Sequence, residues 1–402
     1  MEFTQFDRNM SMNPLPRSSI PEANKEEAIN SFNDEQSISI ARLAWSNSDE
    51  ASNDFRSDYC TKPTFPMLLA IINTSLGDDV TEEDATTNSF QDYVARLLGH
   101  EAALLVLSGT MGNQVSLRTA LSSPPYSILA DYRGHIIHLE AGGASTLCGA
   151  LIKQVVPKNG HHLTLEDIIE NSVLSETPYD CPTRVISLEI PLSGTIMPLS
   201  EVQAISRWAR AQSPPIHMHL DGARLWEAVA SGSYSLHEVG ECFDSIQLCL
   251  TKGLGAPIGS VVVGSLTFIK RARWIRKFLG GGLRAAGVIA APARAAIDDV
   301  FFGGKLKAAQ NKARRASALW ENLGGKLQRP TETNMVWLDF EASGVTRDDF
   351  YLLMRQENLK VMEHPFMNGR IVFHYQISDE ALTKLCRVFK AVLNAPISNT
   401  TV

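Results

Sequence analysis

Residues 245–260 read SIQLCLTKGLGAPIGS. This is a mostly apolar run followed by Lys252 and a glycine-rich turn, which indicates a buried strand that ends at a loop with a charged residue. A second apolar run, HMHLDGAR at residues 217–224, ends in Asp221. Continuous apolar runs of this length are typical of strands that are covered on both faces of a parallel sheet. Charged residues that follow such strands gather at the carboxyl edge of the sheet, where ligands bind. A lone Lys is usually a solvated surface charge, but the flanking glycines, the apolar run and the paired Asp221 favour a functional role for Lys252.

Short apolar runs alternate with helical segments from about residue 90 to residue 290. The predicted strands are 102–107, 126–130, 184–190, 217–220, 245–250 and 259–264, and the predicted helices include 164–174 and 199–211. Alternation over this length predicts an α/β fold with a mostly parallel sheet and right-handed crossovers. Asp221 and Lys252 then fall at carboxyl ends of strands in the same sheet.

The sequence predicts three parts. Residues 1–53 are polar and rich in Asn, Ser and Glu, so we expect a poorly ordered arm with a helix near residues 35–44. Residues 54–300 are expected to form the large ligand-binding α/β domain. Residues 301–402 are expected to form a small C-terminal α/β domain, with helices at 305–323, 347–357 and 379–393 and extended runs at 335–340, 359–363 and 370–375.

Composition and charge exclude several classes of protein. The formal net charge of −7 and the absence of a basic block argue against nucleic acid as a partner. The cations of the stretch Lys305, Lys307, Lys312, Arg314 and Arg315 fit a solvated helix face better than a polyanion site. No apolar stretch is long enough to span a bilayer, and the N-terminus lacks the apolar core of a signal peptide. The six cysteines form no CxxC pair, which favours reduced thiols in a cytoplasmic protein.

Asp221 and Lys252 are the two polar contacts that pyridoxal phosphate needs. A lysine amine forms an imine with this cofactor, and a carboxylate holds the pyridine nitrogen protonated. The turn SGTMGN at residues 108–113 follows a predicted strand and opens a helix, so Gly109 and Thr110 are candidates to hold the phosphate. His135 could stack on the cofactor ring or carry a proton, although the residues alone favour a structural, hydrogen-bonded histidine. Arg224 could bind a substrate carboxylate, and a surface arginine is the competing interpretation.

Several motifs, in this order and spacing, carry a resemblance to a known family. They are FRSD at 55–58, GDDV at 77–80, LSGTMGNQ at 107–114, HLEAGG at 138–143, HLDGARLW at 219–226, KGLGAP at 252–257, GGGLR at 280–284 and TNMV at 333–336. From about residue 54 to the C-terminal helix, the chain resembles the threonine aldolase (β-eliminating lyase) family, fungal type. The resemblance implies the pyridoxal-phosphate-dependent fold of the aspartate aminotransferase group (fold type I).

The resemblance also implies roles for individual residues. Lys252 would bind the cofactor covalently, Asp221 would meet its pyridine nitrogen, and His135 would lie against the ring and act as the base. The phosphate would be held by Gly109 and Thr110, with Arg284 reaching it from a neighbouring subunit. The substrate carboxylate would be held by Ser57, Arg224 and Arg370. Family members are oligomers with shared sites, so we expect a homodimer or homotetramer that acts on a small amino acid.

Three functions remain open at this point. The first is cleavage of a β-hydroxy-α-amino acid, threonine or allo-threonine, to glycine and acetaldehyde. The second is racemisation of an amino acid such as alanine, because fungal racemases of peptide-toxin pathways also resemble this family. The third is a catalytically silent protein of this fold, against which the Asp221 and Lys252 pair speaks. Two departures from the family pattern bear on the substrate: Tyr59 and Cys60 follow Asp58, and Glu189 is followed by Ile-Pro in place of Asn-Thr.

Overall fold

A computed structural model describes residues 39, 45 and 49–394 of the chain. The chain divides into two units, Met1–Ala44 and Trp45–Val402, and the elements from Asp49 onward belong to the second. Apart from residue 39, the predicted helix near residues 35–44 lies outside the described part. At the end of the predicted N-terminal arm, residues Asp49–Ser52 form helix α3, and Ala51 is buried.

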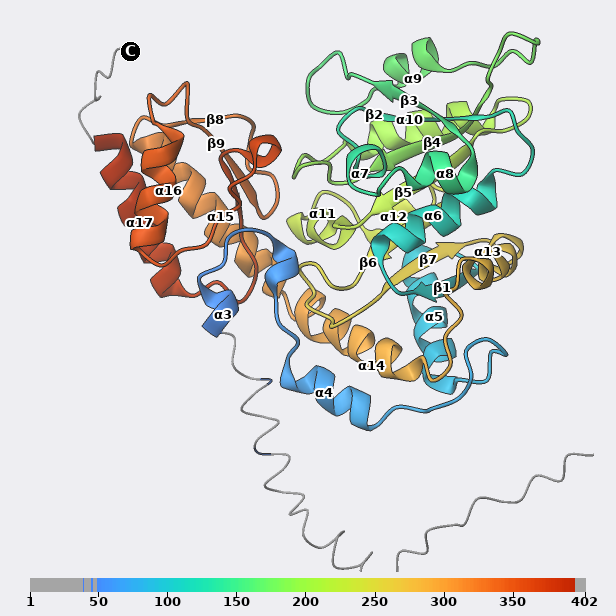
Figure 1. Cartoon of the computed structure of the whole chain (residues 1–402), viewed down its shortest axis with the longest axis horizontal. Helices are drawn as coiled ribbons and strands as arrows, with labels where there is room; N and C mark the ends of the chain where they lie inside the picture. Colours follow the sequence, from blue (N-terminus) through green and yellow to red (C-terminus); the bar gives the residue numbers. More distant parts are fainter. Residues whose placement is uncertain (1–38, 40–44, 46–48, 395–402) are drawn as a thin grey trace, which may run out of the picture. The chain divides into compact units, whose positions relative to one another are not determined.

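The larger sheet has seven strands in the order β1-β7-β6-β5-β4-β2-β3, running from β3 near the top of Figure 1 to β1 below. The strands are β1 (Ala102–Val106), β2 (Ser127–Asp131), β3 (Leu151–Val155), β4 (Thr183–Glu189), β5 (His217–Gly222), β6 (Ser245–Cys249) and β7 (Ser260–Gly264). Strands β2 to β6 pair in parallel, whereas β7 is antiparallel to both β1 and β6. The prediction of a mostly parallel sheet is confirmed, with β7 as the exception. Strand β3 was not predicted.

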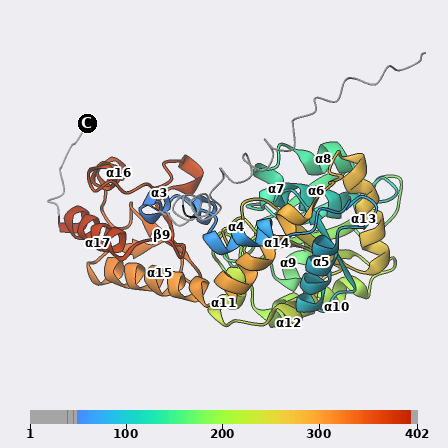
Figure 2. The ribbon, with the colours of Figure 1, turned by 90° about the horizontal axis from the view of Figure 1, so that it is seen from below.

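Helices cover both faces of this sheet. They are α4 (Phe65–Ile72), α5 (Ala85–Leu98), α6 (Gly109–Ala120), α7 (His135–His138), α8 (Gly143–Cys148), α9 (Leu165–Asn171), α10 (Leu199–Arg210), α11 (Leu225–Ser231), α12 (Leu236–Gly240), α13 (Leu266–Phe278) and α14 (Gly287–Ala296). Helices α6, α8 and α13 lie on one face, and α10 and α12 lie on the other (Figure 2). Strands β2, β6 and β7 are buried along their whole length, as their continuous apolar sequences predict.

A second, three-stranded sheet with the order β10-β9-β8 lies in the C-terminal part of the chain. Its elements are α15 (Lys305–Asn322), β8 (Lys326–Leu327), β9 (Met335–Asp339), α16 (Arg347–Gln356), β10 (Arg370–Val372) and α17 (Asp379–Asn394). Buried Trp320, Phe350 and Phe389 belong to its own apolar core. The predicted extended run at 359–363 is wrong, because there Lys360 makes only an isolated bridge, to Asp54.

The residues directly after the predicted arm also pack on this C-terminal core. The Phe55 side chain is completely buried, and its ring centroid lies 5.2 Å from that of Phe373 in an edge-on contact. The backbone N–H of Val372 donates to the carbonyl of Phe55 (3.0 Å). Residues 55–58 are thereby held against β10, so the C-terminal sheet positions the FRSD motif. The predicted division at residues 53/54 and 300/301 stays a prediction.

Among the helices of residues 49–394, none combines the length and the apolar character that crossing a bilayer requires.

Candidate active site

Asp221 and Lys252 lie at the same edge of the large sheet. Asp221 is next to last in β5, where it pairs in register with Gln247 of β6, and Lys252 follows the last residue of β6 by three positions. Both charges act on the same neighbours: Asp221 and Lys252 each shift the pKa of His135 and of Glu189. The structure therefore brings the predicted carboxylate, amine and imidazole into one electrostatic neighbourhood.

The Asp221 carboxylate is held in place by neutral donors. Its Oδ1 accepts the backbone N–H of Ala223 (3.0 Å), and its Oδ2 accepts the side-chain amide of Asn113 (2.7 Å). With its amide nitrogen turned toward Asp221, Gln247 donates a further bond to Oδ1 (3.0 Å). Asp221 is buried, and no cation of the described chain forms an ion pair with it. A buried, oriented carboxylate that lacks a cation fits a protonated pyridine nitrogen, so this position suits the cofactor.

A hydrogen-bond network that could not be predicted from the sequence holds Asp221 through Asn113. The Asn113 amide also donates to Glu140 (2.7 Å), and its oxygen lies 3.1 Å from His219 Nε2. Burial and the neighbouring His217 lower the pKa of His219 to about 3, so His219 stays neutral at physiological pH. The motifs around Asn113, Glu140 and His219 were visible in the sequence, but their contacts span long separations along the chain and gave no local signal.

His135 is the first residue of α7, and it is fixed at two atoms. Its backbone N–H donates to Glu189 Oε2 (2.9 Å), and its Nδ1 lies 2.8 Å from Glu140 Oε1. One ring nitrogen of His135 and one carboxylate oxygen each of Glu140 and Asp221 lie within 4.8 Å of one another. Burial works to lower the pKa of His135, but the Glu140 bond and the Asp221 charge outweigh it and raise that pKa. Since Nδ1 is engaged, Nε2 is the ring atom left for proton transfer.

Glu189, at the end of β4, is a second titratable group beside His135. Burial and the neighbouring Asp221 carboxylate raise the pKa of Glu189 to about 7. In the sequence, Glu189 stands out only because it is followed by Ile-Pro in place of Asn-Thr. Its position next to His135 makes it a candidate proton acceptor near neutral pH.

The predicted phosphate-binding turn lies at the N-terminus of the twelve-residue helix α6. The Ser108 hydroxyl caps the helix by accepting the backbone N–H of Met111 (3.1 Å). The backbone N–H groups of Gly109 and Thr110 have no acceptor within residues 49–394. A Cβ at position 109 would lie 3.2 Å from the Gln247 amide, so glycine keeps this turn close to the strand. Free N–H groups at a helix N-terminus suit an anion such as the cofactor phosphate.

Ser57, Arg224 and Arg370, predicted to hold the substrate carboxylate, lie around a residue that the sequence analysis did not single out. Asp58 is completely buried, and its carboxylate accepts hydrogen bonds from Nε and Nη2 of Arg224 (both 2.7 Å). Arg224 Nη2 also lies 3.3 Å from the Ser57 hydroxyl. Burial would raise the pKa of Asp58, but the Arg224 charge and its bonds hold that pKa well below the usual value. Arg224 is therefore already paired.

Arg370 is the cation of this group that lacks a carboxylate. It is buried, its Nη2 donates to the backbone carbonyl of Arg56 (3.1 Å), and its Nε has no partner within the described residues. Burial and the neighbouring Arg224 lower the pKa of Arg370 to about 10. A buried guanidinium with an unsatisfied N–H suits an incoming carboxylate.

Arg284 is the one predicted site residue that the single chain does not bring to the others. Its side chain is 74% exposed and pairs with Asp78. The expectation that Arg284 reaches a phosphate in a neighbouring subunit stays a prediction.

Comparisons with known proteins identify the relatives of this chain. The model of the family described as beta-eliminating lyase matches residues 54–343. The chain is 51% identical to the aldolase vrtJ of Penicillium aethiopicum, over 85% of this chain and 86% of that protein. It is 39% identical to the alanine racemase TOXG of Cochliobolus carbonum (90% and 93%) and 42% identical to the low-specificity L-threonine aldolase of Eremothecium gossypii (83% and 86%).

A solved structure of threonine aldolase from Leishmania major superposes with a TM-score of 0.72 at 19% identity, over 85% of this chain and 99% of that chain. At this identity the likeness shows the fold alone, and it confirms the predicted fold class. The family-model match and the sequence relatives then confirm the predicted resemblance. The chain belongs to the beta-eliminating lyase family, whose members are pyridoxal-phosphate enzymes.

Proposed function

We propose that this protein is a pyridoxal-phosphate-dependent aldolase that cleaves L-threonine or L-allo-threonine to glycine and acetaldehyde. The observation that carries the proposal is the arrangement of Asp221 and Lys252 at one sheet edge, next to the carboxylate-binding group around Arg370. Relatives named aldolase and L-threonine aldolase, at 51% and 42% identity, support it.

Five residues would hold the cofactor. Lys252 would bind it covalently, Asp221 would pair with its ring nitrogen, and His135 would lie against the ring. Gly109 and Thr110 would hold its phosphate through the free N–H groups at the start of α6. When bound, pyridoxal phosphate supplies an electron sink that stabilises negative charge on the substrate Cα.

The carboxylate-binding group selects the bond that breaks. Arg370, whose Nε lacks a partner, would meet the substrate carboxylate, and Arg224 and Ser57 would support it from the Asp58 side. The Gly253 backbone N–H donates to the Asp58 carbonyl (3.1 Å), so the turn that carries Lys252 and this group are joined. A substrate gripped in this way is oriented so that its Cα–Cβ bond breaks.

His135 is the proposed base, acting directly or through one water. The proton of the substrate β-hydroxyl passes to Nε2 of His135, the Cα–Cβ bond breaks, acetaldehyde leaves, and Cα takes up a proton to give glycine. His135 must be neutral to accept the proton, and Glu140 and Asp221 raise its pKa. The cleavage rate should therefore rise with pH through that pKa.

A second candidate is an amino-acid racemase that supplies a D-amino acid, such as D-alanine, to peptide biosynthesis. The relative named alanine racemase, at 39% identity over most of both chains, favours it. Racemisation breaks the Cα–H bond and needs an acid or base on each side of Cα. Lys252 would serve one side and Tyr59, whose side chain is half-exposed, the other.

We further propose a cytoplasmic homodimer or homotetramer in which Arg284 of one subunit reaches the phosphate of the next. Light scattering of the cofactor-loaded protein measures the subunit number. Arg284→Ala should then weaken cofactor binding, and a strictly monomeric active enzyme would contradict this arrangement.

Separate incubations of the cofactor-loaded protein with L-threonine, L-allo-threonine and L-alanine, followed by chiral amino-acid analysis and an aldehyde assay, test the function. The aldolase proposal predicts equal amounts of glycine and acetaldehyde from a β-hydroxy substrate, and none from the Lys252→Ala variant. D-alanine without aldehyde would instead support the racemase. No turnover of any of them would overturn both.

A further inference from the structure

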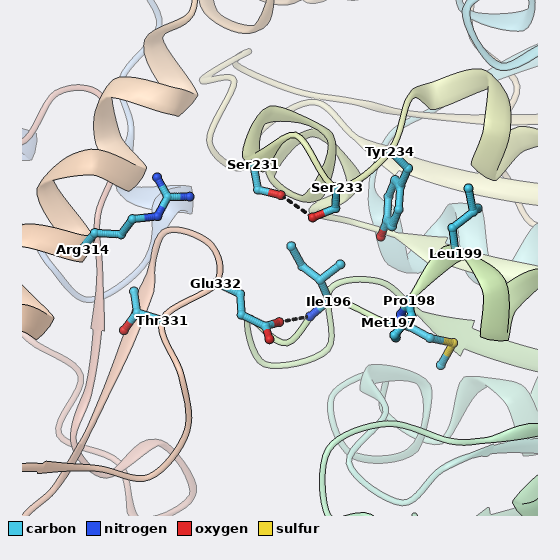
Figure 3. Close-up of a pocket in the computed structure, with 10 residues that line it drawn as sticks. All are labelled: Ile196, Met197, Pro198, Leu199, Ser231, Ser233, Tyr234, Arg314, Thr331 and Glu332. Atoms are coloured by element: carbon cyan, nitrogen blue, oxygen red, sulfur yellow. Dashed lines mark hydrogen bonds between the residues drawn. The ribbon is translucent and has the colours of Figure 1, made fainter.

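A pocket of about 410 Å³ lies apart from the candidate active site, and it shares no lining residue with it. Segment 196–199, before and at the start of α10, and residues 231, 233 and 234, at the end of α11 and after it, form one part of its wall. Arg314 of α15 and residues 331 and 332, before β9, form the rest. Figure 3 shows Arg314 and Thr331 on one side, Tyr234 and Leu199 on the other, and Ile196 and Glu332 between them. A pocket of this volume is within the range that binds small molecules.

Arg314 brings an uncompensated positive charge to this pocket. Its Nη1 donates to the amide oxygen of Asn311 (3.1 Å), and it has no carboxylate partner within residues 49–394. By contrast, Lys312 on the same helix pairs with Asp379 (2.9 Å). The predicted solvated helix face thus contains one arginine that points into a pocket, and an unpaired guanidinium in a concave site suits a carboxylate.

Glu332 brings a negative charge to the same pocket. Its Oε2 accepts the backbone N–H of Ile196 (2.6 Å), which fixes the carboxylate in place. Burial and the neighbouring Glu332 charge raise the pKa of Tyr234, so the Tyr234 hydroxyl keeps its proton. That hydroxyl is buried at the pocket wall and has no hydrogen-bond partner in the described chain. The pocket therefore offers an anchored acidic group beside a fixed hydroxyl.

The rest of the wall is apolar or carries hydroxyls. Ile196, Pro198 and Leu199 supply aliphatic surface. The hydroxyls of Ser231 and Ser233 form a hydrogen bond with each other (2.8 Å). A ligand with one charge would pair with only one of Arg314 and Glu332 and would leave the other, which has the same sign as the ligand, without a partner in the pocket. A ligand with both charges and a small aliphatic side chain satisfies all three surfaces.

We propose that this pocket binds a free aliphatic α-amino acid as a zwitterion. The ligand carboxylate meets Arg314, its ammonium group meets Glu332, and its side chain packs on Ile196, Pro198 and Leu199. This site is separate from the substrate site, and the proposal does not depend on which reaction the enzyme catalyses.

The pocket is also connected to the candidate active site through the chain. Glu332 precedes Asn334 by two positions, and the Asn334 amide lies 3.3 Å from Asp58 Oδ2. The intervening Thr333 hydroxyl donates to the carbonyl of Gly194 (3.2 Å), in the loop that leads to Ile196. An amino acid bound in the pocket thus contacts both segments that flank this link, so it should change KM for the substrate.

Calorimetry on the cofactor-loaded enzyme after borohydride reduction tests the proposal, because reduction locks the cofactor on its lysine and prevents amino acids from reacting there. The probe is L-leucine, and the matched single-charge probes are 4-methylpentanoate and 3-methylbutylamine. The proposal predicts one L-leucine per chain and at least about tenfold weaker binding of both single-charge probes, because each probe lacks one of the two charged contacts.

Arg314→Gln and Glu332→Gln should each weaken L-leucine binding by about tenfold or more. The matched control is Arg315→Gln, which removes a neighbouring exposed arginine and should leave binding unchanged. Circular dichroism checks that the variants fold, and Tyr234→Phe serves as a second probe of the wall if one of them does not. No binding of L-leucine, equal binding of 4-methylpentanoate, or binding that survives both charge substitutions would overturn the proposal.

Discussion

Replacing Asp58 by Asn should destabilise the protein and leave a binding site for small anions. Asp58 is completely buried and neutralises Arg224 through two hydrogen bonds of 2.7 Å, while the adjacent Arg370 forms no ion pair with a carboxylate of residues 49–394. Asp58→Asn keeps the size of the side chain but removes the carboxylate that neutralises Arg224, whose side chain is 14% exposed, beside the buried Arg370. Breaking a buried pair on one side costs about 3–5 kcal/mol, so the free energy of unfolding should fall by that amount.

The anion dependence makes this prediction specific. A monocarboxylate such as formate can replace the lost carboxylate, and at a concentration about 100 times its Kd it should restore about 2.7 kcal/mol. The assay is denaturant unfolding at fixed ionic strength, in formate and in chloride. The matched control is Asp299→Asn, which breaks a partly exposed pair with Lys305 (2.8 Å) and should cost no more than about 1 kcal/mol, with no response to formate.

The pH dependence has a definite sign. Arg224 holds the pKa of Asp58 well below the usual 3.8, so the stability that Asp58 contributes is complete above that pH and is lost as the pH falls further. Asp58→Asn should lack this acid-side loss. If Asp58→Asn were as stable as the wild type, Asp58 would not neutralise Arg224 as described. The same conclusion would follow if formate restored no more stability to Asp58→Asn than to the control Asp299→Asn.

Three further predictions concern the same edge of the sheet. Burial raises the pKa of Glu227 from 4.5 to about 8, so stability should fall as the pH rises between these values, and Glu227→Gln should remove that fall in thermal unfolding from pH 5 to pH 9. His135→Gln should lower kcat by about 10²–10⁴-fold, whereas Glu189→Gln should retain more activity and keep the rise of the rate with pH that His135 causes; the reverse ranking in pH–rate profiles would make Glu189 the base. Gly253→Ala should reduce both stability and cofactor affinity, because φ is +46° there and the new Cβ would lie 3.2 Å from Glu227; a cofactor titration that matches the wild type would contradict a strained turn beside Lys252.

The strands that carry the site could be predicted because their chemistry is local. A run such as 245–250 is apolar except for Ser245 and Gln247, and β6 forms there within one residue of the predicted end. Strand β3 lacks the apolar signal of a buried strand because it is an edge strand that contains Lys153 and Gln154, and only Val155 of its residues is buried.

The contacts that complete the site could not be predicted from spacing. Asp58 and Arg224 are 166 residues apart, and Asn113 and Asp221 are 108 apart. Only the folded sheet brings such groups together, and a single Asp or Asn in a loop or helix carries no sign of its partner. The predicted carboxylate binder Arg224 was visible as a residue type, but its pairing with Asp58, which leaves Arg370 as the open cation, required the structure.

Borohydride reduction of the pyridoxal-phosphate-loaded protein, followed by peptide mass spectrometry, identifies the lysine that binds the cofactor. The pairing of Asp221 with Lys252 predicts one pyridoxyl phosphate group per chain, on Lys252, and an Asp221→Ala variant that binds the cofactor more weakly. A label on a different lysine, or no label at saturating cofactor, would contradict the assignment of the active site.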